Sequence, residues 1–131
     1  LAPQTRKVLE RAIEKSKNNT KMKLVFAMDY GSRDEIVEAM KKYAAEVSQG
    51  RENNLVEKEV EQYLMTHDYG NVDLLIRTSN EKRISNFLLW QIAYAELIFT
   101  QTPWPLFTPQ EFDKCIEEYH SRDRRFGGLN K

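Results

Sequence analysis

The order of apolar and polar positions along the chain predicts mostly helices. Apolar residues recur every three to four positions in four stretches, which places them on one face of a helix. A fifth stretch, Phe87–Phe99, is almost wholly apolar and rich in Leu and Ala, which favours a buried helix over a strand. The four amphipathic helices are expected from Pro3 to about Lys17, from Ser32 to about Gly50, from Val56 to Leu64 and from Pro109 onward.

Two of the expected helix starts carry Ser or Thr followed three residues later by Glu. Ser32 and Glu35 form one such pair, and Thr108 and Glu111 form the other. In a capping box the hydroxyl accepts a hydrogen bond from an early helix N–H, and the carboxylate accepts one from the N–H of the capping residue. We therefore expect both pairs to be capping boxes.

Two short runs are apolar on both faces, as is typical of interior strands in a parallel sheet. They are Leu24–Met28 and Leu74–Ile76. With the helices they predict an α/β fold, a parallel sheet flanked by helices, with about five helices and two central strands. Because a stable open sheet normally needs three or more strands, we expect residues 1–131 to be the C-terminal portion of one larger domain.

The balance of charges and the scarcity of Cys and His exclude several classes of protein. Lys and Arg together number 20, as do Asp and Glu, so the net charge is zero and a protein that coats nucleic acid is not expected. Cys115 is the one cysteine, and neither His67 nor His120 has partners at ligand spacing, which excludes a disulfide framework and a Cys/His metal cluster. This fits a cytoplasmic protein, and no apolar run reaches the length of a membrane span.

The stretch from Asp73 to Phe87 combines a strand end with a polar turn. From Arg77 to Ser85 it holds three cations, three hydroxyls and one carboxylate. They are Arg77, Lys82 and Arg83, then Thr78, Ser79 and Ser85, and Glu81. A strand end followed by a helix start is where α/β proteins bind anions, and two arginines suit a phosphate or pyrophosphate. A solvated loop held by salt bridges fits the same residues, and their chemistry leaves both interpretations open.

A second turn has the same order of strand, small residues, arginine and helix. It reads Asp29-Tyr30-Gly31-Ser32-Arg33, and we expect Asp29 and Arg33 to face the crevice at the carboxyl end of the sheet. The alternative for Arg33 is an ordinary ion pair on the helix surface.

Glu96 interrupts the long apolar stretch. A lone buried carboxylate is unfavourable, so Glu96 must be paired, lie at a rim or bind a metal. Residue type alone favours a salt bridge. Near the end of the last helix, Arg122, Arg124 and Arg125 fit ordinary helix termination.

These residues in this order resemble the cis-prenyltransferases, the undecaprenyl pyrophosphate synthase (isoprenyl transferase) family. The stretch Asp73–Leu97 is similar to the C-terminal signature of that family. Residues 30–33 resemble its Tyr-Gly-Gly-Arg turn, residues 104–105 its Trp-Pro turn, and residues 124–128 its C-terminal ending. The resemblance therefore covers nearly the whole chain.

The resemblance implies a transferase of prenyl groups. Such an enzyme condenses isopentenyl pyrophosphate, with cis geometry, onto an allylic pyrophosphate such as farnesyl pyrophosphate and makes a polyprenyl pyrophosphate. The resemblance also implies a cytoplasmic homodimer with Mg²⁺ as cofactor, without nucleic acid, and with peripheral membrane contact through its lipid product.

Roles for individual residues follow from the resemblance. Three side chains would bind the pyrophosphate of the isopentenyl unit, the residue between two of them would present its backbone, and a glutamate would orient the arginines. These residues are, in that order, Arg77, Arg83 and Ser85, then Ile84, then Glu81. Glu96 would be a ligand of Mg²⁺. Arg125 and Gly127 match the family's C-terminal Arg-x-Gly, which reaches the partner's active site.

The chain departs from the family's pattern in three ways. Asn80 stands where glycine is usual, and because asparagine tolerates a left-handed backbone we expect the turn to be retained. Asp29 stands where asparagine is usual and adds negative charge near the expected site. The family's N-terminal Asp followed by Gly-Asn does not occur in the sequence. We therefore expect no catalytic residue in this chain and no condensation by the chain alone.

Two alternatives from other classes stay open. A non-catalytic partner subunit of a heteromeric cis-prenyltransferase would be expected to lose the pyrophosphate-binding residues, which this sequence contains. A small anion-binding interaction domain would be a stable monomer, whereas two strands with open edges predict poor solubility. The length of the product is not encoded here, since the walls of the product tunnel belong to the N-terminal part of the family's domain.

Overall fold

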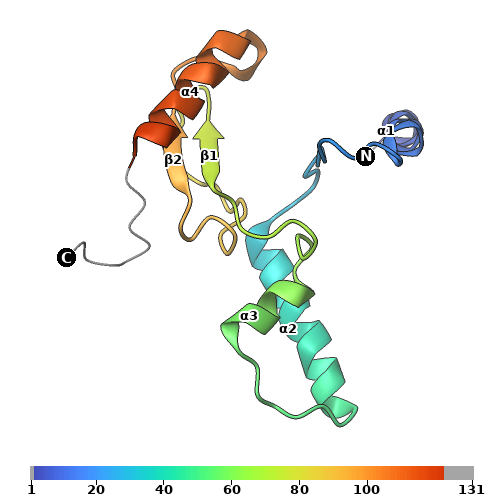
Figure 1. Ribbon diagram of the computed structural model, residues 1–131. Helices are drawn as coiled ribbons and strands as arrows, with labels where there is room; N and C mark the ends of the chain where they lie inside the picture. The colour runs from blue at the N-terminus through green and yellow to red at the C-terminus, as the bar shows by residue number, and fades with distance from the viewer. Residues whose placement is uncertain (1, 123–131) are drawn as a thin grey trace, which may run out of the picture.

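A computed structural model describes residues 2–122 (Figure 1). Its helices and strands confirm the expected α/β class, with a parallel sheet of two strands. The elements in chain order are α1 (Pro3–Ser16), α2 (Ser32–Ser48), α3 (Glu57–Val60), the 3₁₀ turn η1 (Glu61–Tyr63), β1 (Leu74–Arg77), β2 (Glu96–Phe99), the 3₁₀ turn η2 (Trp104–Leu106) and α4 (Pro109–Ser121).

Strands β1 and β2 run parallel and end at the same edge of the sheet. The register pairs Leu74 with Glu96 at one end and Arg77 with Phe99 at the other. The pairing continues beyond the strands, because the Thr100 amide donates to the Arg77 carbonyl at 2.9 Å. The loops that follow the two strands therefore lie side by side, and each holds the other in place.

The expected helix over Phe87–Phe99 is wrong. Its second half pairs with β1 as strand β2, and the Glu96 amide donates to the Asp73 carbonyl at 2.9 Å. Its first half is a series of turns that contains Leu88 with a φ of 47°, which an α-helix excludes. Leu and Ala favour a helix, but pairing with a strand earlier in the chain decides the conformation.

The expected strand over Leu24–Met28 is not formed within residues 2–122. This segment is extended but has no strand partner in that part of the chain. Its apolar side chains are largely exposed, with Leu24 at 75% and Phe26 at 67%. A run that is apolar on both faces is stable as a strand only between two neighbours, and the described residues supply neither.

One of the two expected capping boxes is confirmed. At the start of α4, the Glu111 amide donates to the Thr108 hydroxyl at 3.3 Å, and the Thr108 amide donates to the Glu111 carboxylate at 3.1 Å. The expected capping box at Ser32 and Glu35 is wrong, because Gly31 is the residue that precedes the helix. The Ser32 hydroxyl instead accepts from the Leu89 amide, and the Glu35 carboxylate accepts from the Met65 amide.

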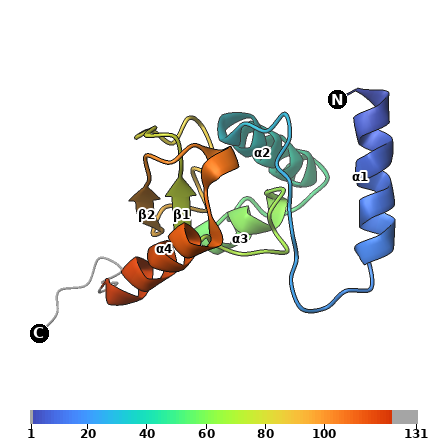
Figure 2. The same cartoon turned by 90° about the horizontal axis from the view of Figure 1, so that it is seen from above.

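Tertiary packing is concentrated around α2. Ala39 of α2, Tyr63 and Leu64 form a small buried cluster, to which Tyr43 and Trp90 add. Helix α1 stands apart from the other elements in both views (Figures 1 and 2). No helix within residues 2–122 is both long enough and apolar enough to cross a bilayer.

Candidate functional site

Arg77 is the last residue of β1 and lies at the edge of the sheet where α/β proteins bind ligands. Its Nε is buried and has no hydrogen-bond acceptor in the described part of the chain. A buried donor without an acceptor is unfavourable by about 1–3 kcal/mol, and by more when it is charged. This position therefore favours an acceptor that is supplied by a ligand.

The loop after β1 carries the other predicted binding residues. Glu81 and Arg83 form an ion pair there, and the Arg83 side chain remains 68% exposed. Ser85 is exposed and Ile84 is partly buried. The loop thus combines features of both sequence interpretations, a salt bridge at Arg83 and a donor without a partner at Arg77.

Left-handed backbone is concentrated in the two polar turns. The non-glycine residues with positive φ among residues 2–122 are Asp29 (51°), Ser79 (66°), Asn80 (55°), Ser85 (53°), Asn86 (62°) and Leu88 (47°). Each such residue is strained by about 1–2 kcal/mol, although Asn and Asp tolerate it best. Strain of this kind gathers at functional sites, where the surrounding structure maintains it. The left-handed conformation expected for Asn80 is confirmed.

The two polar turns are joined at the N-terminus of α2. The Ser32 amide donates to the Asn86 carbonyl at 2.8 Å, and the Arg33 amide donates to the Asn86 side-chain oxygen at 2.9 Å. In return, the Leu89 amide donates to the Ser32 hydroxyl at 2.9 Å. The sequence predicted that both polar turns, Asp29–Arg33 and Asp73–Phe87, face one crevice. These hydrogen bonds show that the two segments are in contact.

A buried carboxylate lies under this junction. Glu35 is 2% exposed and accepts hydrogen bonds from the Met65 amide at 2.8 Å, from Gln91 Nε2 at 3.1 Å and from the Tyr30 hydroxyl. Burial, together with the bond to Glu35, raises the pKa of Tyr30 to about 12, so its hydroxyl remains a donor. Glu35 therefore links α2 to the segment after η1 and to the loop that leads into β2.

Glu96 lies at the other end of the sheet from Arg77. The register pairs Glu96 with Leu74, the first residue of β1, whereas Arg77 is the last residue of that strand. Three steps along a strand span about 10 Å. The Glu96 carboxylate accepts from Arg122 Nη1 at 2.8 Å, so the salt bridge that residue type favours is formed. This bond, with the one to Glu118, also raises the pKa of Arg122.

Glu96 alone does not make a magnesium site. Mg²⁺ is held by one or two carboxylates together with water and phosphate oxygens. Within the described residues, no three His, Cys, Asp or Glu side chains gather as a metal-binding group. A magnesium ion at Glu96 would therefore need oxygens from a bound pyrophosphate or from elsewhere in the protein, and it would compete with Arg122 for the carboxylate.

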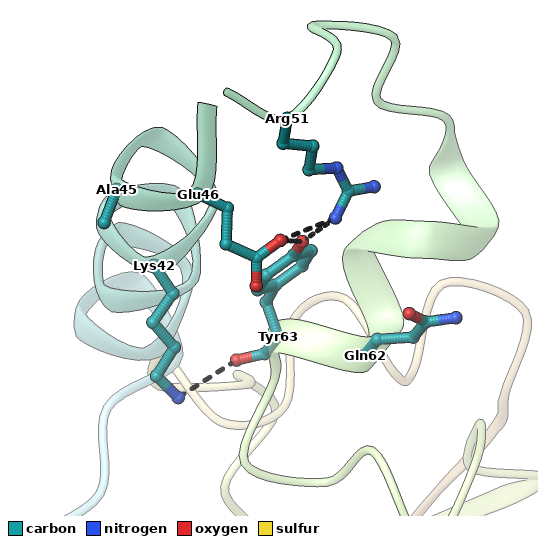
Figure 3. Close-up of a pocket in the computed structure, with 6 residues that line it drawn as sticks. All are labelled: Lys42, Ala45, Glu46, Arg51, Gln62 and Tyr63. Atoms are coloured by element: carbon teal, nitrogen blue, oxygen red, sulfur yellow. Dashed lines mark hydrogen bonds and ion pairs between the residues drawn. The ribbon is translucent and has the colours of Figure 1, made fainter. Parts of the chain in front are cut away.

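A pocket of about 630 Å³ opens between the second half of α2 and η1 (Figure 3). Its charged groups satisfy one another: Arg51 donates to Glu46 at 2.8 Å, and the Tyr63 hydroxyl donates to the same carboxylate at 2.5 Å. The bonds from Tyr63 and Arg51 lower the pKa of Glu46. Because these charges are neutralised and the strained turns contact the opposite end of α2, this pocket is not the candidate site.

The residues of the candidate site only partly match those that the sequence predicts. Arg125 and Gly127 lie outside the described residues. The sequence did not predict three residues as contributors to the site: Asn86, Glu35 and Arg122. Glu96 stood out as a polar exception in an apolar stretch, but no local pattern marks Asn86, because its partners lie far away in the sequence.

Comparison with protein families gives an independent result. The sequence profile of a family described as putative undecaprenyl diphosphate synthase matches residues 1–127. The isoprenyl transferase of Staphylococcus haemolyticus is 49% identical over 129 residues, which are 97% of this chain and 50% of that protein. The isoprenyl transferase of Zymomonas mobilis is 48% identical over 124 residues, 93% of this chain and 50% of that protein. The chain spans about half the length of the curated relatives it matches.

Solved structures show the same similarity. Lavandulyl diphosphate synthase from Lavandula x intermedia, in complex with dimethylallyl diphosphate, superposes with a TM-score of 0.87 at 37% identity, over 93% of this chain and 53% of that one. A probable undecaprenyl diphosphate synthase from Campylobacter jejuni gives a TM-score of 0.80 at 37% identity, over 97% of this chain and 58% of that one.

Proposed function

Since the chain belongs to the undecaprenyl diphosphate synthase family, as its sequence motifs predicted, we propose that it carries the isopentenyl pyrophosphate site of a cis-prenyltransferase. The relatives are isoprenyl transferases, which supports transfer of a prenyl group as the reaction. The whole enzyme would join isopentenyl pyrophosphate to an allylic pyrophosphate. The dimethylallyl diphosphate bound to the lavandulyl relative supports an allylic diphosphate as the second substrate.

The observation that carries this proposal is the buried Nε of Arg77. It lies at the carboxyl end of β1 and has no acceptor within residues 2–122. A pyrophosphate offers several anionic oxygens to such a donor, and a guanidinium matches them in a fork geometry. Arg83 and Ser85 would complete the contacts from the adjoining loop, with Ile84 presenting its backbone and Glu81 orienting Arg83.

The residues of this chain would bind and orient the isopentenyl substrate. The condensation breaks the carbon–oxygen bond of the allylic pyrophosphate, forms a carbon–carbon bond to the isopentenyl unit and releases a proton from that unit, and negative charge develops on the departing pyrophosphate. Arginines that are already fixed in place would bind the isopentenyl pyrophosphate without reorganising, and would thereby keep its reacting carbon oriented toward the allylic unit. We place the catalytic aspartate outside this sequence, in the half that the relatives have in addition.

Glu96 would hold Mg²⁺ as one ligand at its own end of the sheet, where the ion would supply charge stabilisation to the oxygens of a pyrophosphate that reaches it. Arg122 then has a role in this proposal, because it holds the Glu96 carboxylate in place before the ion binds. A homodimer, with Arg125 and Gly127 reaching the partner's site, is part of the same proposal.

Titration of isopentenyl pyrophosphate into the gene product that carries this sequence tests the site. We expect Arg77→Ala and Arg83→Ala each to weaken binding about tenfold or more, the factor typical of a hydrogen bond to a charged group. Arg11→Ala on helix α1 is the matched control and should bind like the wild type. Unchanged binding by Arg83→Ala would contradict the assignment.

A prenyl-elongation assay tests the whole proposal. Residues 1–131 alone should give no product with Mg²⁺, farnesyl pyrophosphate and isopentenyl pyrophosphate, whereas the longer gene product should elongate the primer. Activity of residues 1–131 alone would show that the catalytic group lies within this sequence. Inactivity of both proteins would favour the non-catalytic subunit.

A further inference from the structure

Helix α2 begins without a local cap. Gly31 precedes the helix and has no side chain, and no side chain within the turn accepts a hydrogen bond from the first helical amides. The first amides of a helix have no partner inside it and need acceptors from outside. Ser32 and Arg33 are two of these residues, and both amides are nevertheless satisfied.

Asn86 supplies both acceptors from the loop that follows β1. Its backbone carbonyl accepts from the Ser32 amide at 2.8 Å, and its side-chain oxygen accepts from the Arg33 amide at 2.9 Å. Asparagine is among the best capping residues when it precedes a helix. Here the same chemistry acts from a position 53 residues away in the sequence.

The fit between the two segments is close. A Cβ atom added at Gly31 would lie 2.9 Å from the amide nitrogen of the Asn86 side chain, which is closer than such atoms approach without movement. Asn86 also has a φ of 62°, a conformation that asparagine tolerates and most residues do not. Gly31 therefore leaves the space that the Asn86 side chain occupies, and asparagine suits the backbone conformation at position 86.

The contact matters because of what it anchors. Two hydrogen bonds that Asn86 makes to the start of α2 tie the end of loop 81–86 to that helix. Other bonds of this loop are local: Glu81 pairs with Arg83, the Glu81 amide donates to the Thr78 carbonyl, and the Ile84 carbonyl accepts from the Phe87 amide. Ile84 and Ser85 directly precede the anchored residue, so their placement relative to Arg77 depends on it.

We infer that Asn86 is a positioning residue, which caps α2 from a distance and thereby sets the loop that binds isopentenyl pyrophosphate. The inference rests on the proposed function. It assigns to Asn86 no contact with the substrate. It predicts that loosening this anchor lowers the affinity for isopentenyl pyrophosphate and leaves the allylic substrate and the chemical step unaffected.

The test is steady-state kinetics of the gene product with Mg²⁺, farnesyl pyrophosphate and isopentenyl pyrophosphate. Asn86→Gly keeps the left-handed backbone available and removes the side chain with its acceptor oxygen, while the backbone carbonyl that accepts from Ser32 remains. We expect the KM for isopentenyl pyrophosphate to rise about five- to tenfold, the factor that one neutral hydrogen bond gives. The kcat and the KM for farnesyl pyrophosphate should stay near the wild-type values. Asn71→Ala, which removes an exposed asparagine from another loop, is the matched control.

A double-mutant cycle separates the anchor from general loosening. Gly31→Ala displaces the Asn86 side chain and should raise the same KM, but it should add little in the Asn86→Gly background, because the displaced group is already gone. Additive effects of the two substitutions would overturn the inference.

Hydrogen exchange supplies a readout that does not depend on activity. The Arg33 amide should exchange faster in Asn86→Gly than in the wild type, and equal exchange would overturn the inference. The kinetics also separate this inference from the proposed function. A KM that Arg83→Ala raises and Asn86→Gly leaves unchanged refutes the positioning role alone, whereas a KM that Arg83→Ala leaves unchanged refutes the binding site itself.

Discussion

Glu35 is the one charged side chain that is buried among residues 2–122. Its hydrogen-bond partners are neutral: a tyrosine hydroxyl, a backbone amide and a glutamine amide. A buried carboxylate is tolerated when its oxygens accept several hydrogen bonds. At the scale of single residues, the fold therefore depends on one acceptor that joins three segments beneath the candidate site.

Replacing this acceptor should destabilise the protein. Glu35→Gln exchanges one carboxylate oxygen for an NH₂ group that faces donors, so one of the three bonds is lost inside the protein. We expect a loss of about 1–3 kcal/mol in the free energy of unfolding. Urea unfolding of the gene product measures it, with the exposed Glu38→Gln on the same helix as the control. A stability equal to that of the control would show that the Glu35 bonds contribute nothing net.

The roles of residues could be predicted only where they are local in sequence. Arg77, Glu81 and Arg83 stand within one short polar stretch, so their shared location was predictable, as was the left-handed turn at Asn80. The local sequence predicted that Glu35 forms a capping box with Ser32. In the structure Glu35 instead accepts hydrogen bonds from Met65 and Gln91, which lie in distant segments. Those partners leave no periodic signal in the sequence.

At the scale of elements, α4 and β2 behave in opposite ways. Helix α4 starts with a local capping box and proline, and the structure forms it where the sequence predicts. Strand β2 comes from a stretch with helical composition, and its hydrogen bonds to β1 decide its form. Local sequence signals predict an element correctly where its backbone hydrogen bonds are internal, as in a helix. They are insufficient where the backbone groups bond to a partner strand from elsewhere in the sequence.

The capping box of α4 predicts a pH dependence. The Thr102 hydroxyl and the Thr108 amide donate to Glu111 and lower its pKa from the ordinary value of 4.5. A lowered pKa in the folded state means that the stabilisation is complete above the unfolded-state pKa and is lost as the pH falls through the folded-state value.

We therefore expect Glu111→Gln to reduce the stability of the gene product at pH 7 and to remove part of its loss of stability below about pH 4.5. Thermal unfolding across pH 3 to 7 measures this. Glu117→Gln, on the same helix and exposed, is the control. Parallel pH profiles for wild type and Glu111→Gln would contradict the prediction.

At the scale of the whole molecule, the described residues bury little apolar surface. The buried apolar side chains are Ala39, Tyr63, Leu64, Ile98 and Cys115. The half-buried β1 and the exposed segment 24–28 indicate surfaces that need a cover. The strand count of the sequence predicted an incomplete sheet, although it did not predict β2.

Residues 1–131 produced alone should therefore self-associate. The double substitution Leu24→Lys and Phe26→Lys should reduce this association, because it places charge on the exposed apolar run. Sedimentation velocity over a range of concentrations measures it. Met65→Lys, an exposed apolar position outside the run, should leave the association unchanged. A monomer at all concentrations would contradict the prediction.

The cap that Asn86 provides also affects the order in which the protein folds during synthesis. Helix α2 emerges from the ribosome well before its cap does, since the capping residue is made 53 residues after Arg33. At ordinary rates of synthesis this interval is roughly three to ten seconds. During it the first turn of α2 lacks two of its acceptors and frays. The helix start and the loop at the candidate site are thus completed by the same event, the arrival of Asn86.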